Sequence, residues 1–317
     1  MKDFVVSVDR SAVDIELKSV LMATDFSPAS EKPLHQALAI AHHYGAKLYV
    51  VYVVPSLGYL MAGPESLAVA AEQAEDDLLR LKRELVRNNS LKGLDHEFIV
   101  CQGDVPEQLH SIITEKGIDL VVLGTHARQG LEKVVLGSVA EELFRHSGCH
   151  VLTVGPNSYK EDRVNVDSAT RSFLFATDFG EASVRAAPYA VSLAHRLKAK
   201  LIVMHVIPTN LTPQGFGWYT DRDVRQMREQ ARMAILRRLE HLFSPETDEE
   251  APLEVEYIAQ FGVPSEKILQ VALHRQTDLI IIGLRRSPHG GSASHMPGTT
   301  SYKVMCGAGC PVLTIRH

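Results

Sequence analysis

The fold is decided by residues 21–55, LMATDFSPASEKPLHQALAIAHHYGAKLYVVYVVP, because this stretch recurs at residues 174–208 as LFATDFGEASVRAAPYAVSLAHRLKAKLIVMHVIP. The two copies align without a gap, and about 16 of the 35 positions are identical. Two shorter matches follow in the same order, DLVVLG with DLIIIG and GCHVLT with GCPVLT. A repeat of about 140 residues has the size of a domain. The chain is therefore predicted to contain two domains of one fold.

Each copy alternates apolar runs with amphipathic stretches, and the first copy shows this most clearly. Its β-branched run 47–54 is continuously apolar, which is typical of a strand covered on both faces. The expected strands are 20–26, 47–54, 97–101, 119–124 and 150–154, and the expected helices are 30–44, 65–88, 105–116 and 133–146. Strands that alternate with helices predict an α/β fold, with two tandem doubly wound domains that each hold a mainly parallel five-stranded sheet. Ligands of such sheets bind at the carboxyl ends of the strands, where the strand order reverses.

Composition and charge narrow the class of protein. The chain has 317 residues, 45% of them hydrophobic, and a formal net charge of −5, so it is expected to be globular and not to bind nucleic acid. It contains no apolar run near the roughly 18 residues of a membrane span, and no signal peptide is readable. Four cysteines make no disulfide framework, which favours the cytoplasm. The expected boundaries are 1–16 for an N-terminal extension, 17–155 and 171–317 for the domains, and 156–170 for a linker.

Two familiar phosphate-binding motifs are missing. There is no G-x-x-x-x-G-K-[ST], and the first strand-to-helix turn has no glycine, so neither a P-loop nor a dinucleotide fingerprint is present. A different pattern follows the fourth expected strand, with Gly124, Ala127, and then Gly137-Ser138. Free backbone N–H groups and a hydroxyl there could surround phosphate oxygens. An ordinary turn explains the same glycines, so the spacing alone leaves both interpretations open.

The repeated motifs resemble the universal stress protein family, as a tandem member with two UspA-like domains. The resemblance is carried by ATDF at 23–26 and at 176–179, and by the stretch 123–143. It implies a fold similar to the adenine nucleotide alpha hydrolases. It also implies a regulatory stress-response module that binds an adenine nucleotide, with ATP, with or without Mg²⁺, as the cofactor.

The family's motif G-x2-G-x9-G-[ST] assigns the site residues position by position. Asp25 matches the acidic residue near the ribose, Val53 a backbone contact to adenine, and Ala23 a neighbour of the base. The resemblance implies a first-domain site of Ala23, Asp25, Val53, Leu123, Gly124, Ala127, Gly137, Ser138 and Val139, with Ala127 in place of the second glycine.

The second copy departs further from the motif. Arg286 replaces the second glycine, and the return at Gly298-Thr299 comes two residues late. The weaker second set is Asp178, Val206, Gly283, Arg286, Gly298 and Thr299. The longer loop of the second copy allows two interpretations. It is either a wider phosphate-binding loop in which Arg286 contacts the phosphates, or a site that has lost its ability to bind. Asp25 and Asp178 could equally serve as caps of the first helices. We therefore expect nucleotide binding mainly in the first domain.

Two other functions stay open, a slow ATPase and an interaction protein that has lost nucleotide binding. His126 is the nearest candidate for a general base, and no catalytic residue is assigned. Cys149 and Cys310 precede apolar strands, where cysteine acts as a small hydrophobe, and no metal site is expected. The last strand of each copy would be an exposed sheet edge. We expect these edges to pair within one chain as a pseudo-dimer, whereas a homodimer between chains is not readable.

Overall fold

The computed structural model describes residues 16–56, 64–125, 140–143, 148–155, 171–209, 220–243, 253–284 and 299–316. The described residues form two compact units, which are called the first domain (16–155) and the second domain (171–284 and 299–316). Among the described helices, none combines the length and the apolar character that a membrane span requires.

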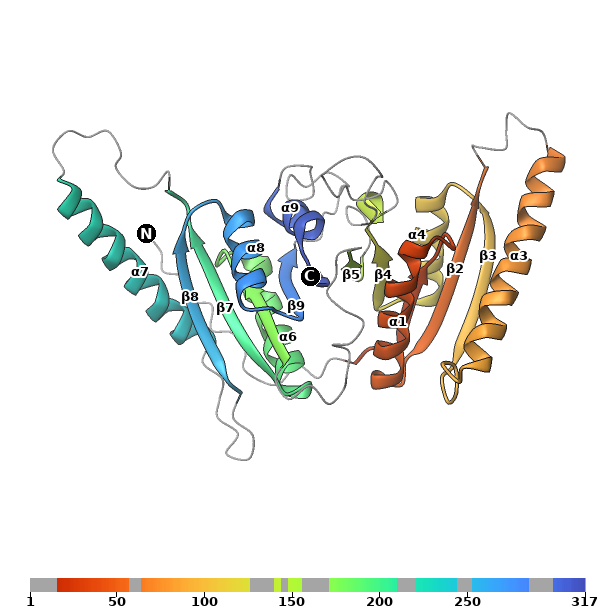
Figure 1. Ribbon diagram of the computed structural model, residues 1–317, viewed down its shortest axis with the longest axis horizontal. Coiled ribbons are helices and arrows are strands. Elements are labelled where there is room, and N and C mark those ends of the chain that lie inside the picture. Colours follow the sequence, from red (N-terminus) through yellow and green to blue (C-terminus); the bar gives the residue numbers. More distant parts are fainter. Residues whose placement is uncertain are drawn as a thin grey trace. The chain divides into compact units, whose positions relative to one another are not determined.

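The first domain alternates strands and helices as the sequence predicts (Figure 1). Its elements are β1 (Ser19–Ala23), the 3₁₀ turn η1 (Pro28–Ser30), α1 (Glu31–Tyr44), β2 (Lys47–Pro55), α3 (Pro64–Arg87), β3 (His96–Gly103), α4 (Val105–Lys116), β4 (Leu120–Gly124) and β5 (His150–Val154). The expected bounds of α4 and β5 are confirmed, and β1 ends three residues earlier than expected. The helix expected at 133–146 lies mostly outside the described residues.

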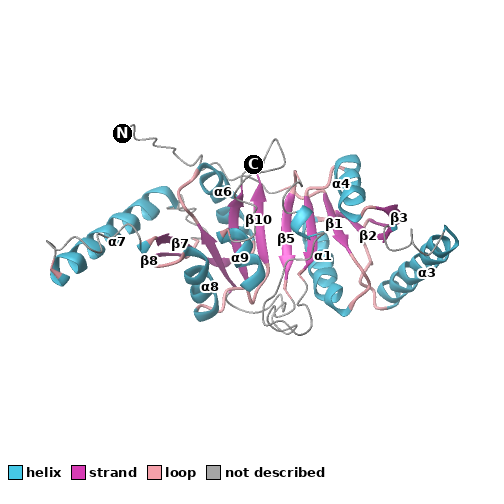
Figure 2. Ribbon diagram, turned by 90° about the horizontal axis from the view of Figure 1, so that it is seen from above, coloured by secondary structure: helices cyan, strands magenta, loops and turns pink. Residues whose placement is uncertain are grey.

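The described strands of the first domain pair in the order β3-β2-β1-β4-β5, and every pair is parallel. Val20 in β1 lies opposite Leu48 on one side and Leu120 on the other, and its side chain is fully buried. In Figure 2, α1 and α3 lie on one side of this sheet and α4 on the other. The strand order therefore reverses between β1 and β4, which is where open α/β sheets bind ligands.

The second domain repeats the pattern. Its elements are β6 (Arg171–Ala176), α6 (Glu181–Arg196), β7 (Ala199–Ile207), α7 (Asp221–Phe243), β8 (Val255–Phe261), α8 (Pro264–His274), β9 (Leu279–Leu284), α9 (Thr300–Gly307) and β10 (Val312–Arg316). The described strands pair in parallel in the order β8-β7-β6-β9-β10. The order reverses between β6 and β9, which is the equivalent point to that of the first domain.

In each domain, an equivalent aspartate accepts a hydrogen bond at the amino end of the central strands. Asp119, before β4, accepts a hydrogen bond from the backbone N–H of Ser19 at 3.0 Å. Asp278, before β9, accepts one from the backbone N–H of Ser172 at 2.8 Å. These bonds hold the central strands in register at their amino ends. The expected ligand edge lies at the carboxyl ends, where the two domains can differ without changing this contact.

Candidate functional site

An aspartate organises the turn that follows the first strand of each domain. In the first domain, one carboxylate oxygen of Asp25 accepts hydrogen bonds from the Ser27 N–H (3.0 Å), the Ser27 hydroxyl (2.6 Å) and the Ser30 hydroxyl (2.7 Å). Phe26, inside this turn, has a φ of 56°, in the left-handed region that non-glycine residues rarely adopt. The turn holds the exposed Asp25 in a fixed position at the carboxyl end of β1.

The second domain builds the same turn with one donor fewer. Asp178 accepts from the Gly180 N–H (2.8 Å) and the Ser183 hydroxyl (2.7 Å), and Phe179 has a φ of 60°. Gly180 takes the place of Ser27 and brings no hydroxyl. The helix that follows, α6, has Gly180 as its N-cap and no side-chain cap, so Asp178 stabilises the turn before the helix rather than the first N–H groups of the helix. The presence of Asp178 thus has a structural explanation that needs no ligand.

The second strand of each domain presents backbone groups beside this turn. Thr24 N–H donates to the Val51 carbonyl at 2.9 Å, as the last bond between β1 and β2. In a parallel ladder, alternate residues direct their backbone groups to the same neighbour, so the backbone of Val53 points past the end of β1. The Val53 side chain is buried. The Thr177 N–H bond to Met204 (2.9 Å) places Val206 in the same way in the second domain.

Gly124, the last residue of β4, and Gly283, the last but one of β9, occupy equivalent positions, but they are constrained differently. A Cβ added at Gly124 would lie 3.1 Å from the Ala29 carbonyl oxygen, which is tight. A Cβ at Gly283 would lie 2.3 Å from the Ala182 carbonyl oxygen and 2.7 Å from the Ser183 Cα, where only a backbone shift could make room. Packing against the start of α6 therefore requires Gly283, whereas Gly124 is less constrained by its surroundings.

The two domains differ in the residue that follows this glycine. Thr125 is 1% exposed, and among the described residues its hydroxyl has no hydrogen-bond partner. Its N–H donates to the Val154 carbonyl at 3.0 Å, so the backbone holds Thr125 in place at the reversal point. A buried hydroxyl without a partner costs about 1–3 kcal/mol, which a ligand or a water at this edge would recover. The second domain has the apolar Leu284 here, also buried.

An aromatic pair flanks each aspartate turn. Phe26 and Tyr52 have ring centroids 4.7 Å apart in the first domain, and Phe179 and His205 have theirs 4.5 Å apart in the second. In the second domain, the Arg238 guanidinium of α7 also lies over the Phe179 ring, at 4.2 Å. Phe179 is thus covered by an imidazole and a guanidinium.

His205 is the titratable member of that stack. Its Nδ1 donates to the Thr177 carbonyl at 2.8 Å. Burial lowers the pKa of His205 below its ordinary value, and the bond to Thr177 partly opposes this shift. Of the two charged neighbours, Asp178 raises the pKa and Arg238 lowers it. Burial therefore favours the neutral imidazole.

The structure brings together part of each predicted set. In the first domain, Ala23, Asp25, Val53, Leu123 and Gly124 lie at or next to the carboxyl ends of β1, β2 and β4. The predicted residues outside the described part of the chain are Ala127, Gly137, Ser138 and Val139, the candidate base His126, and, in the second domain, Arg286 and Gly298.

Two of the sequence predictions find a structural role. Thr299 is the N-cap of α9 and accepts from the Tyr302 N–H at 3.4 Å. Cys149 and Cys310 are buried, which confirms them as small core residues, and burial raises the pKa of Cys310 to about 11.

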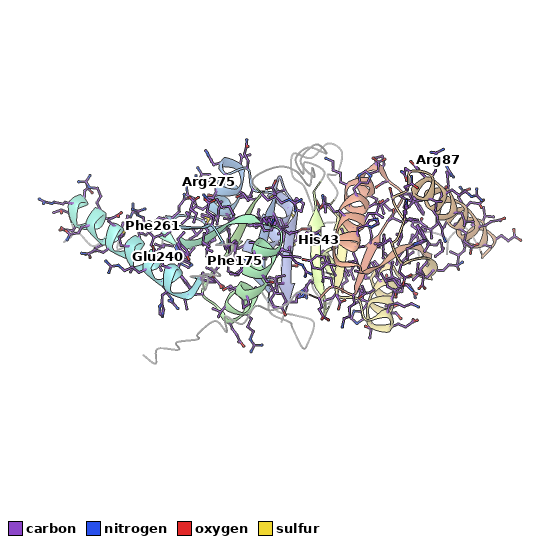
Figure 3. All side chains as sticks on the ribbon, turned by 90° about the horizontal axis from the view of Figure 1, so that it is seen from below. His43, Arg87, Phe175, Glu240, Phe261 and Arg275 are labelled. Carbon is purple, nitrogen blue, oxygen red and sulfur yellow. The ribbon has the colours of Figure 1, made fainter. Side chains whose placement is uncertain are left out.

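Sequence reasoning missed the serines that hold the aspartates and the aromatic pairs. The signal was present, because Asp-Phe-x-x-Ala-Ser is identical at 25–30 and 178–183. Arg238 gave no such signal, since it lies on α7, 59 residues after Phe179. Figure 3 shows the side chains of this region and labels Phe261, over whose ring another α7 residue, Arg228, lies at 5.7 Å.

Comparison with known proteins gives one consistent result. A family model described as the universal stress protein family matches residues 16–155 and again residues 169–316. The putative universal stress protein SSP1056 of Staphylococcus saprophyticus is 32% identical over 149 residues, which cover 46% of this chain and 87% of that protein.

One solved structure shares the fold over nearly the whole chain. A universal stress protein from Archaeoglobus fulgidus superposes with a TM-score of 0.64 at 20% identity, over 94% of this chain and 98% of that one. Another universal stress protein, solved in complex with cAMP, matches 46% of this chain and 96% of its own, with a TM-score of 0.33 and 18% identity.

Proposed function

This chain is a tandem member of the universal stress protein family, and we propose that it binds an adenine nucleotide, ATP with or without Mg²⁺, mainly through its first domain. In this role it is a regulatory stress-response module rather than an enzyme. The observation that carries the proposal is the buried Thr125 hydroxyl, which among the described residues has no partner and lies at the reversal point of the sheet. The second domain has Leu284 at that position.

The described residues of the first domain suit the parts of a nucleotide. The carboxylate of Asp25 is exposed and held by its turn, so it can accept hydrogen bonds from the ribose hydroxyls. The backbone of Val53 can pair with the edge of the adenine. Gly124 and Thr125 begin the segment in which Ala127, Gly137, Ser138 and Val139 would surround the phosphates.

The second domain fits a nucleotide less well. Its glycine is explained by packing, its next residue is apolar, and Arg238 covers the aromatic ring beside its aspartate. Binding there through Asp178, Val206, Gly283, Arg286, Gly298 and Thr299 is the weaker part of the proposal. The pairing of the last strands of the two domains within one chain stays a prediction from the sequence, and so does a location in the cytoplasm.

Calorimetric titration of the full chain with ATP and Mg²⁺ tests the proposal. We expect about one strong site per chain. Gly137→Val should abolish it, because the added side chain fills the space of the phosphates. Gly298→Val is the matched control and should leave binding unchanged.

The reverse result would assign the site to the second domain, and no binding in the wild-type chain would refute the proposal. A steady release of ADP at about 1 per second or faster would favour an enzyme instead.

A further inference from the structure

Helix α3 exposes three large apolar side chains to solvent. Val69 is 65% exposed, Leu79 48% and Val86 56%. Valine is a weaker helix former than leucine or alanine, and an exposed apolar side chain gains nothing from burial. The fold of the first domain therefore gives no reason for either valine on this side of α3.

The three apolar residues belong to one regular row. Together with Glu72, Asp76 and Arg83 they occupy positions 69, 72, 76, 79, 83 and 86, with spacings that alternate between three and four. This is the spacing of the contact positions of a coiled coil. All six residues are exposed, while Leu78 and Leu85 on the other side of α3 are buried. We call these six residues the α3 seam.

The charges along the α3 seam change sign along the helix. Glu72 and Asp76 lie in its first half and Arg83 in its second half. Two antiparallel copies can be aligned so that Val69 faces Val86 and Glu72 faces Arg83, each contact occurring twice by symmetry. Parallel copies would place Glu72 against Glu72 and Arg83 against Arg83. In this antiparallel alignment four of the six contacts are complementary, and the two central ones place Asp76 opposite Leu79. The parallel alignment brings no opposite charges together, so the charge pattern favours the antiparallel, two-fold symmetric arrangement.

We propose that the α3 seam is a docking surface for a second copy of this chain, and that two α3 helices pair antiparallel in a symmetric homodimer. One pair of helices falls at the small end of specific interfaces, below about 1,200 Å² in total, so the dimer is weak and depends on concentration. One pair of helices leaves the Glu72–Arg83 ion pairs within reach of solvent, so salt weakens the dimer. Arg87, the last residue of α3, adds a further positive charge at the basic end, and Figure 3 shows its side chain extending from the ribbon.

The equivalent helix of the second domain lacks such a seam. Its exposed large apolar residues are Met227 (38%) and Met233 (41%). They are six residues apart, which places them on different sides of a helix with 3.6 residues per turn. The seam is therefore a property of α3 and not of the repeat, which makes α7 an internal reference.

Charge reversal tests the pairing in the full chain by sedimentation velocity over a range of concentrations. Glu72→Arg places two arginines opposite each other, and Arg83→Glu places two glutamates opposite each other. Each single variant should raise the dimer Kd by about tenfold or more. The double variant restores opposite charges at both contacts and should return the Kd to within about threefold of the wild type.

A matched control separates this pairing from a change of net charge. Glu84→Arg makes the same change on α3 outside the seam, and it should leave the Kd unchanged. A wild-type chain that stays monomeric would overturn the proposal, as would open-ended polymers, a dimer insensitive to the single variants, or a double variant that is not rescued. A folding defect from either substitution would not be repaired by the second, so rescue reports on the interface.

Discussion

The two domains share their aspartate turns and the glycines near the ends of β4 and β9, yet they differ at the residue that follows each glycine. The aspartates have a structural cause in both copies, because Asp25 and Asp178 each hold a turn, whereas packing requires the glycine only in the second copy, where Gly283 makes room for α6. The domains differ directly after these glycines, where the first has Thr125 and the second Leu284. A position that is identical in both copies therefore says more about folding than about binding, and the exchanged positions distinguish the two sites.

The largest effect that this comparison predicts is on stability, at the glycines. Gly283→Ala should lower the unfolding free energy of the second domain by about 3 kcal/mol, because a methyl group would overlap the Ala182 carbonyl. Gly124→Ala should cost the first domain about 1 kcal/mol or less, since its nearest contact is 3.1 Å. Hydrogen exchange of β6 and β1 peptides measures each domain separately. Equal losses would show that packing does not distinguish the two glycines.

The next effect concerns the hydroxyl at the end of β4. Thr125→Val keeps the shape and removes the hydroxyl, so it should weaken ATP binding about tenfold while slightly stabilising the unliganded protein. Leu284→Val is the control in the second domain and should leave ATP affinity unchanged. Titration calorimetry and thermal unfolding of the same samples give both numbers. An unchanged affinity for Thr125→Val would remove the main support for the first-domain site.

A smaller effect is expected from making the two turns alike. Ser27→Gly gives the first domain the residue of the second and removes the 2.6 Å bond to Asp25. We expect a loss of about 1 kcal/mol in the stability of the first domain. The reverse exchange, Gly180→Ser, should bring no equal gain, because a Cβ there would lie 2.9 Å from the Asp178 carboxylate. Urea unfolding of both variants checks this asymmetry.

The smallest effect is a dependence on pH at the aromatic pairs. Because burial lowers the pKa of His205 in the folded state, the unfolded chain binds its proton more readily. The stability that His205 contributes is complete above its unfolded pKa of about 6.5 and is lost as the pH falls towards the folded pKa. His205→Tyr copies Tyr52 and should reduce the acid sensitivity of the second domain. The measurement is the melting temperature of the wild type and of the variant at pH 7.5 and at pH 5.5. An equal change in melting temperature between the two pH values for both proteins would contradict the prediction.

The regular elements could be predicted because their signals are local. Val105–Lys116 was expected as a helix and is one, with Asp104 as its N-cap accepting from the Glu107 N–H at 3.1 Å. The end of β1 was placed three residues too late, because the apolar run continues to Phe26 while the chain already turns. A positive φ at a phenylalanine is imposed by the surrounding hydrogen bonds, and no local pattern of residues announces it.

The candidate site was predictable only in part. The repeat indicated Asp25 and Gly124, and the strand ends bring them to one edge of the sheet. The sequence could not show that Gly283 is needed for packing, since that depends on how closely β9 approaches α6. Nor could it show Arg238 over Phe179, because this contact joins a helix to a distant turn. Motif spacing shows which residues are present, whereas the distances in the structure show what Gly283 and Arg238 contact.

The close approach at Gly283 also has an evolutionary consequence. Substitution of this glycine would destabilise its domain, so selection for folding alone favours keeping it, whether or not the domain binds anything. A duplicated domain of this kind can lose its ligand and keep the backbone path that once served it. Binding could then return through a few side-chain replacements, such as Leu284→Thr, without any redesign of the sheet. A duplicated domain that binds no ligand can in this way acquire a new binding specificity by side-chain substitution.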